Sequence, residues 1–158
     1  MPTIYEAIKQ DHDEHRALLA TIADSAKAKS DRKQAWDRFY HDVKAHAAAE
    51  EETFYSKLIS KTWGQDAARH SVHEHQQLDD LMEELNGMAV DDDGWSDKFG
   101  KLKHDYEHHI DEEEDDVFTR AREVIDDAEI EGFGSRFLQR KSEEAGLIDE
   151  KRSDSLED

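Results

Sequence analysis

The chain has 158 residues, most simply one domain, with 39% charged and 35% hydrophobic residues and a formal net charge of −20. It contains no cysteine, which excludes disulfides, thiolate metal sites and cysteine nucleophiles, and no apolar run approaches the roughly 18 residues of a membrane span. The negative charge argues against nucleic acid and membranes as partners, and we expect a soluble, cytoplasmic monomer without a signal peptide.

The predicted elements are all helices, because the only proline is at position 2 and long stretches carry no helix breaker. Thr3 and Glu6 have the spacing of a capping box at the start of the first helix. Turns are predicted at Trp63-Gly64 and at residues 90–94. The four long helices are expected at about residues 3–28, 30–61, 66–85 and 96–128.

Long helices joined by short loops favour an all-α fold, an up-down-up-down four-helix bundle built from two duplicated αα-hairpins. We assign residues 1–131 to this bundle. For residues 132–158 we expect a short fifth helix at about 135–144, followed from Asp149 by a disordered acidic tail with few apolar side chains to bury.

The two hairpins are related by a gap-free repeat with an offset of 63 residues. Apolar positions repeat, such as Leu18 with Leu81, as the packing of similar hairpins requires. Polar positions repeat as well, pairing His12 with His75, His46 with His109, Glu50 with Glu113, and Glu51 with Glu114. Packing alone does not explain the repetition of side chains that are typical metal ligands.

Six of these side chains are expected to converge on the bundle interior. Positions i and i+4 of a helix share a face, so Glu50 lies on the face of His46, and Phe54 continues that face into the core. By the same reasoning His12 follows the apolar Ile8. The predicted metal ligands are His12, His46, Glu50, His75, His109 and Glu113.

Two buried carboxylates without compensation would each cost several kcal/mol or take up protons. A pair of metal ions removes this cost, with Glu50 and Glu113 bridging and two histidines on each ion. Imidazole and carboxylate ligands without thiolate favour iron first, and then manganese or zinc.

The remaining candidates are expected to lie outside this ligand set. His15 falls on the inward side and is more consistent with a hydrogen-bond donor beside the site than with a fifth nitrogen ligand. His41 and His104 point away from the ligands, and for Glu51 and Glu114 a solvated role is favoured over contact with the edge of the site. A solvent-facing position is expected for His70, His73 and His108.

At these residues the chain resembles the hemerythrin-like HHE cation-binding domain family, in particular the bacterial hemerythrin-like proteins. The matching segments lie in all four predicted helices and are DH at 11–12, HAAAEEETFY at 46–55, EH at 74–75 and HIDEEEDDVF at 109–118. The resemblance implies that the four histidines are terminal ligands of a non-haem di-iron centre bridged by Glu50 and Glu113.

The chain departs from the oxygen-carrying hemerythrins at two positions. It has Ser71 where they carry a second histidine on the third helix, and Glu113 comes four residues after His109, where they carry an aspartate five residues after. With one nitrogen fewer, an iron can keep an open position, which favours redox chemistry with O2, NO or peroxide. The alternatives are a catalase-like peroxide-scavenging enzyme, an iron or oxygen sensor or iron store without turnover, and a metal-free acidic interaction module.

Overall fold

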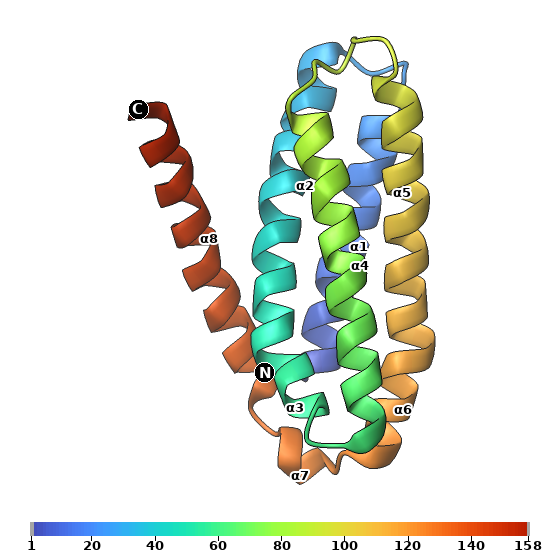
Figure 1. Ribbon diagram of the computed structural model, residues 1–158, viewed down its shortest axis with the longest axis vertical. Helices are drawn as coiled ribbons and strands as arrows, with labels where there is room; N and C mark the ends of the chain where they lie inside the picture. Colours follow the sequence, from blue (N-terminus) through green and yellow to red (C-terminus); the bar gives the residue numbers. More distant parts are fainter. Residues whose placement is uncertain (1, 158) are drawn as a thin grey trace.

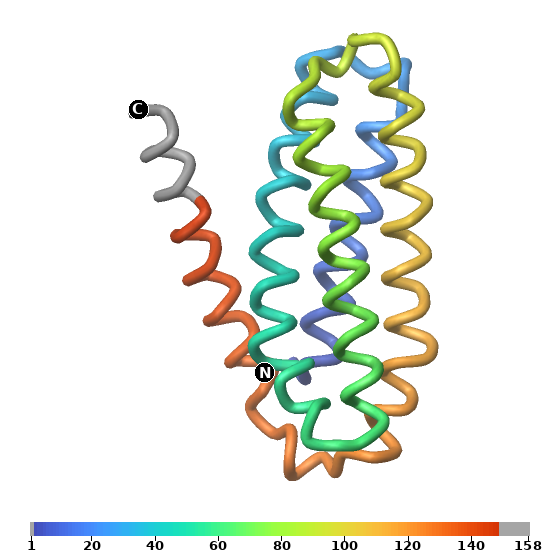
Figure 2. Tube along the Cα trace, viewed as in Figure 1, coloured from blue at the N-terminus to red at the C-terminus, as the bar shows by residue number. Residues whose placement is uncertain are grey.

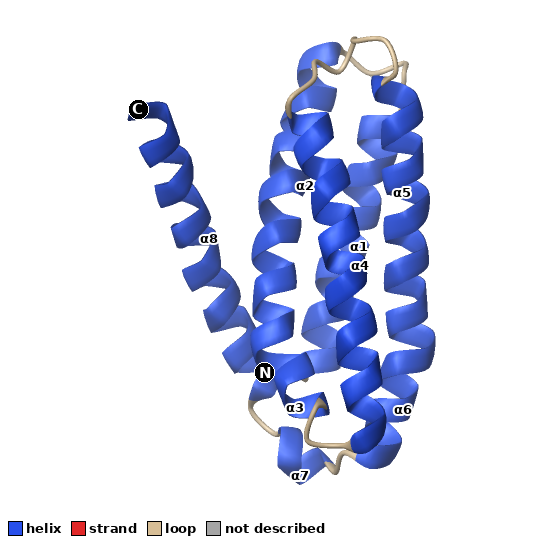
Figure 3. Cartoon of the chain, viewed as in Figure 1, coloured by secondary structure: helices blue, strands red, loops and turns tan. Residues whose placement is uncertain are grey.

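The structure, a computed structural model, describes the backbone of residues 2–157 and the side chains of residues 2–148. Every regular element in this part of the chain is a helix (Figure 3), so the predicted all-α class is confirmed. Within the same residues, none of the helices combines the length and the apolar character that crossing a membrane requires.

Four long helices lie side by side, with their axes nearly parallel (Figure 1). They are α1 (Ile4–Ala23), α2 (Lys29–Glu50), α4 (Thr62–Asn86) and α5 (Trp95–Glu112). The trace in Figure 2 runs in opposite directions along successive long helices. Because α1 and α4 each contact both α2 and α5, the four helices enclose one interior.

Both α2 and α5 continue through a π-helical turn. These turns are η1 (Glu51–Tyr55) and η2 (Glu113–Val117), followed by the short helices α3 (Ser56–Leu58) and α6 (Phe118–Val124). A π turn accommodates an extra residue and is often found at functional sites. Each of the two turns starts at or directly after one of the predicted bridging glutamates.

A further long helix, α8 (Phe133–Glu157), follows the short α7 (Asp127–Ile130) and packs against α1 and α2. It is longer than the helix expected at 135–144. Its backbone extends into the segment from Asp149 for which we expected disorder, and the side chains of that segment lie outside the described residues. Phe137 anchors the start of α8, since its ring is fully buried.

The helix ends differ from the predictions in two informative places. The capping box of Thr3 and Glu6 is confirmed, but α1 ends at Ala23 rather than near residue 28, because Asp24 has an extended backbone (ψ 100°). The turn predicted at Trp63-Gly64 is wrong, since α4 begins at Thr62. Gly64 lies in its first turn, where an added Cβ would come within 1.8 Å of a backbone oxygen of the preceding segment.

The apolar core is divided into two clusters, one towards each end of the long helices. One cluster contains Trp36 and Leu19 and lies towards the α1–α2 and α4–α5 connections. The other contains Ile8, Phe54 and Phe137 and lies at the opposite end. The predicted ligands lie where these two clusters meet, so a buried polar layer crosses the middle of the bundle.

Candidate metal centre

The polar layer brings all six predicted ligands together. Side chains of five of them are at most 4% exposed, and that of His75 is 10% exposed. Their ligand atoms form two groups that share Glu50, each with its atoms within 4.8 Å of one another: His12, His46, Glu50 and Glu113 in one, and Glu50, His75 and His109 in the other. The repeat in the sequence therefore corresponds to two adjacent groups of ligand-type atoms.

Glu50 faces both groups through the two ends of its carboxylate. Its Oε2 lies 3.2 Å from His46 Nε2, and its Oε1 lies 3.3 Å from His75 Nε2. Both oxygens are buried, and neither has a hydrogen-bond partner. The nearby imidazoles hold the pKa of Glu50 well below its usual range, although burial alone would raise it. The carboxylate is therefore charged, and it spans the two groups.

Glu113 occupies the equivalent place in the other half of the repeat. Its Oε1 lies 3.1 Å from His12 Nε2 without forming a hydrogen bond, and its Oε2 lies 3.9 Å from His109 Nε2. The Tyr55 hydroxyl donates to Oε2 at 2.5 Å. Burial and the neighbouring carboxylates raise the pKa of Tyr55 well above its ordinary value, so this hydroxyl stays protonated and fixes the orientation of Glu113.

Every histidine of the layer is also bonded through its outward nitrogen. The Nδ1 hydrogens are donated to Glu114 by His12 (2.7 Å), to Asp11 by His46 (2.7 Å), to Glu51 by His75 (2.9 Å) and to Glu74 by His109 (3.0 Å). Because a carboxylate can only accept, each Nδ1 carries a hydrogen, and the Nε2 of a neutral ring then directs a lone pair into the layer. This is the carboxylate–histidine arrangement that supports metal-binding imidazoles.

The four outer carboxylates follow the same offset of 63 residues, since Asp11 corresponds to Glu74 and Glu51 to Glu114. The expectation that Glu51 and Glu114 are merely solvated is wrong, because each is bonded to a core histidine. The sequence repeat could have identified all four outer carboxylates. Two of them directly precede a ligand histidine, in the segments DH at 11–12 and EH at 74–75, and the other two directly follow the bridging glutamates.

The donor set fits metal ions. If two ligand atoms each lie about 2.1 Å from one ion, and the angle between them at the ion is a right angle, they are about 3.0 Å apart. The inward Nε2 atoms of His75 and His109 are 3.2 Å apart, and His12 Nε2 is a buried nitrogen with no hydrogen-bond partner. Buried polar atoms without partners are costly. A cation that accepts these lone pairs removes that cost.

In the absence of a cation, protons take its place. Burial lowers the pKa of His46, but the Glu50 and Asp11 carboxylates outweigh it and raise that pKa to about 10. Glu50 and Glu51 likewise raise the pKa of His75 to about 9 against the effect of burial. In the metal-free protein, His46 and His75 are therefore protonated near neutral pH.

His15 belongs to a separate buried network. Its Nδ1 accepts from the Tyr106 hydroxyl at 2.5 Å, and its Nε2–H donates to Asp42 at 2.6 Å. With both nitrogens bonded, His15 has no lone pair for a metal, and burial lowers its pKa to about 4. Lys141 of α8 lies 2.9 Å from both Asp42 and Asp11 and closes the network. Sequence reasoning missed Tyr106, Asp42 and Lys141.

The other histidines lie outside the polar layer. His104 is exposed, and His41 is half-buried. The three histidines for which we expected a solvent-facing position are all exposed: His70, His73 and His108.

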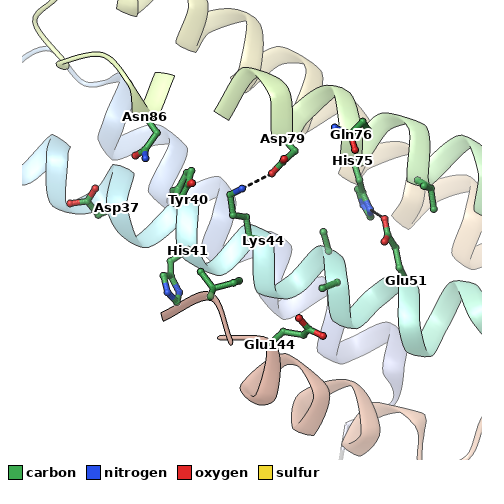
Figure 4. A pocket seen from close by; sticks show the side chains of 14 residues that line it. Asp37, Tyr40, His41, Lys44, Glu51, His75, Gln76, Asp79, Asn86 and Glu144 are labelled. Carbon is green, nitrogen blue, oxygen red and sulfur yellow. Dashed lines mark hydrogen bonds and ion pairs between the residues drawn. The ribbon is translucent and has the colours of Figure 1, made fainter. Parts of the chain in front are cut away.

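A small cavity borders the layer on the side of the second group. Its volume is about 30 Å³, and its walls include the apolar side chains of Val43, Leu78, Met82 and Ile110 beside His46, His75 and His109. An open groove of about 580 Å³ between α2, α4 and α8 (Figure 4) shares Lys44, Ala47, His75 and Asp79 with it.

Lys44 lies where the groove and the small cavity meet. Its ammonium group is bound to Asp79 at 2.7 Å, as the dashed line in Figure 4 shows, and to Glu83 at 2.5 Å. Figure 4 also shows His75 and Glu51 facing each other at one end of the groove. The side of the metal centre nearest His75 thus has a connection to solvent.

The helical bundle gathers four imidazoles and two carboxylates, and several of their buried atoms have no hydrogen-bond partner. These features define a metal-binding protein of the all-α class. More narrowly, the chain belongs to the hemerythrin HHE cation-binding domain family, whose sequence model matches residues 3–121. The resemblance seen in the sequence is therefore confirmed over all four long helices.

Two known proteins illustrate this relationship. The chain is 28% identical to a hemerythrin HHE cation-binding domain-containing protein from Mycobacterium kansasii, whose crystal structure superposes with a TM-score of 0.79 over 93% of this chain and 90% of the other. It is 23% identical over 139 residues to a protein of Nostoc sp. named DNA nickase. That match covers 88% of this chain but only 39% of the length of the Nostoc protein.

Proposed function

We propose that this protein is a non-haem di-iron protein that binds or reacts with O2, NO or peroxide inside the bundle. Glu50 and Glu113 would bridge the two ions. The four terminal ligands would be His12, His46, His75 and His109. One observation carries the proposal: two groups of nitrogen and oxygen ligand atoms share Glu50, and four buried atoms of these residues (both carboxylate oxygens of Glu50, Glu113 Oε1 and His12 Nε2) lack the hydrogen-bond partners that such atoms otherwise need.

Iron is the metal that we favour, because the site offers imidazole and carboxylate groups without thiolate. When bound, an iron pair would supply the electrons and an open coordination position for a small ligand. The residues around the site supply orientation and proton control. Tyr55 holds one oxygen of Glu113 through its hydroxyl hydrogen, and the outer carboxylates fix the direction of each imidazole.

The cavity beside His75 supports a small ligand. About 10–15 Å³ of such space is enough for a water molecule. A cavity of about 30 Å³ therefore accepts a diatomic molecule or peroxide and excludes organic substrates. Its apolar lining suits O2 or NO, and the groove along Lys44 provides the route from solvent.

We further propose that the protein works as a monomer and does not bind nucleic acid. A chain with a net charge of −20 is repelled by phosphate backbones. The Nostoc protein carries the name DNA nickase, but this chain spans 39% of its length.

The proposal is tested by metal analysis of the purified protein, paired with its visible absorption before and after reduction. About two irons per chain are expected, as in other carboxylate-bridged di-iron bundles. Replacing His46 or His109 with Ala should abolish tight metal binding, whereas H41A and H104A should leave the metal content unchanged. Full metal content in H46A and H109A would contradict the ligand assignment, provided that circular dichroism shows both variants to be folded.

A second measurement separates binding from turnover. The iron-loaded protein is mixed with hydrogen peroxide, and O2 release is followed with an electrode. Sustained release would identify a catalase-like enzyme. A single spectral change without release would identify a protein that binds or reacts once.

A further inference from the structure

A second cluster of histidine and carboxylate groups lies outside the polar layer, where α4 meets the end of α5. His70 Nε2 is 3.1 Å from Glu74 Oε1 and 3.3 Å from Glu112 Oε1. One ligand atom from each of the three residues lies within 4.8 Å of the other two. The cluster thus has the composition of a cation site.

This cluster lies at the mouth of a cavity of about 270 Å³ that also reaches His109 and Glu113 of the metal centre. Its lining side chains range from exposed to buried: His70 is 56% exposed, Glu112 31% and Glu74 19%, whereas His109 is 4% and Glu113 1% exposed. The cavity therefore connects the surface cluster with the buried centre.

Two buried oxygens without hydrogen-bond partners belong to side chains that line the same cavity. They are Ser71 Oγ, in a residue that is 3% exposed, and Glu113 Oε1, in a residue that is 1% exposed. Buried oxygens of this kind are costly unless a polar group or a cation satisfies them. Glu113 belongs to the proposed metal centre, but Ser71 belongs neither to it nor to the surface cluster, so its hydroxyl is an independent sign that this cavity takes a polar or charged ligand.

The charge of the cavity wall also favours a cation. Besides Glu74, Glu112 and Glu113, the wall carries Asp66 and Asp116, and none of the described residues that line it is lysine or arginine. The groove of Figure 4 differs, since Lys44 is one of the residues that line it. The third carboxylate cluster, around Asp11 and Asp42, is already neutralised by Lys141.

We propose that His70, Glu74 and Glu112 form a capture site for a divalent cation, which then moves along this cavity to the metal centre. Glu74 belongs to both sites, because the Oε1 that faces His70 also accepts from His109 Nδ1 at 3.0 Å. The inference rests on the proposed metal-binding function. In this proposal, metal ions enter through the acidic cavity, and the small ligand enters along the groove at Lys44.

The test compares the rate of metal uptake with the amount of metal held at equilibrium. Metal-free protein is mixed with Co²⁺ in a stopped-flow instrument, and the visible bands of Co²⁺ bound at the centre are followed. Acidic clefts raise the rate of cation association by about 10–1,000-fold, so uptake by H70Q/E112Q should be at least about tenfold slower. Its final metal content and thermal midpoint should equal those of the native protein.

The matched control is H73Q/E107Q, which makes the same two changes on the same helices at residues that do not line the cavity. Its uptake should be as fast as that of the native protein. Equal rates in both double variants would overturn the capture site. Loss of equilibrium metal content in H70Q/E112Q would also overturn it, because the residues would then hold the metal rather than deliver it. If native protein took up no metal at all, the proposed function itself would fail.

Discussion

At the scale of single residues, the core histidines act through both ring nitrogens. The outward Nδ1–H is donated to a carboxylate, which fixes the ring and makes the inward nitrogen more basic. The outer carboxylates therefore orient the imidazoles of the proposed metal centre, although none of them is among the proposed ligands.

The variant E114Q tests this role. The substituted amide keeps the size of the side chain and can still accept from His12 through its oxygen, but the negative charge is lost. We expect the metal affinity, measured by competition with a chelator, to fall by about 10–100-fold. The control E107Q removes a carboxylate that pairs with Lys103 on the outer face of α5, and its affinity should match that of the native protein. Equal affinities in both variants would contradict the role of Glu114.

The repeat in the sequence was sufficient to predict the six proposed ligands as a set, because a second copy of the same spacing is unlike a chance surface pair. The outer carboxylates obey the same offset and could have been found in the same way. The network of His15, Tyr106 and Lys141 could not, because Lys141 has no counterpart in the repeat and reaches Asp11 only through the packing of α8.

At the scale of elements, α8 supports one half of the metal centre. The Phe137 ring meets the His46 ring edge-on, with centroids 5.5 Å apart. One turn later, Lys141 binds Asp11, the outer partner of the same histidine. A helix outside the repeat thus restrains one proposed ligand from two directions.

Replacing Phe137 with Ala should reveal how firmly α8 is held. Because the ring is fully buried, the free energy of unfolding should fall by about 3–5 kcal/mol in urea denaturation. The neighbouring Leu138 is 41% exposed, so L138A should change it by no more than about 0.5 kcal/mol. A similar small loss in both variants would mean that α8 does not pack on the bundle in solution.

The sequence pattern predicts the long helices of the bundle but not the π turns or the length of α8. Apolar spacing located the long helices, because their stripes are regular. It could not reveal the π turns η1 and η2, since an extra residue in one turn leaves the stripe before it unchanged. Nor could it extend α8, whose polar sequence resembles a tail as much as a helix.

For the molecule as a whole, the stability of the metal-free protein is linked to the protons that His46 and His75 hold beside the carboxylates of the centre. His46 and His75 have pKa values raised to about 10 and about 9 by the surrounding carboxylates, against about 6.5 in an unfolded chain. Between about pH 6.5 and pH 9 to 10, the folded state therefore binds more protons than the unfolded state. The corresponding stability is present below about pH 6.5 and is lost as the pH rises through 9 to 10.

The thermal midpoint of the metal-free protein should accordingly fall between pH 7 and pH 10. In a chain of this size, each 1 kcal/mol lost lowers the midpoint by about 2–4 °C. In H46Q, which lacks one of the two histidines with raised pKa values, the thermal midpoint should fall less over this pH range. Metal loading should release protons and remove the dependence. A midpoint that is constant or rises over this range in calorimetry would contradict the protonation of the centre.

The position of α8 makes the two halves of the proposed metal centre differ in their access to solvent. The ligand set is duplicated, but its surroundings are not. His75 lines the groove along Lys44 and His109 lines the acidic cavity, whereas His12 and His46 line neither and lie in the half that α8 covers. Two bound ions would therefore be inequivalent. The ion held by the second half would exchange with the medium first, and the ion beneath α8 would be the inert one.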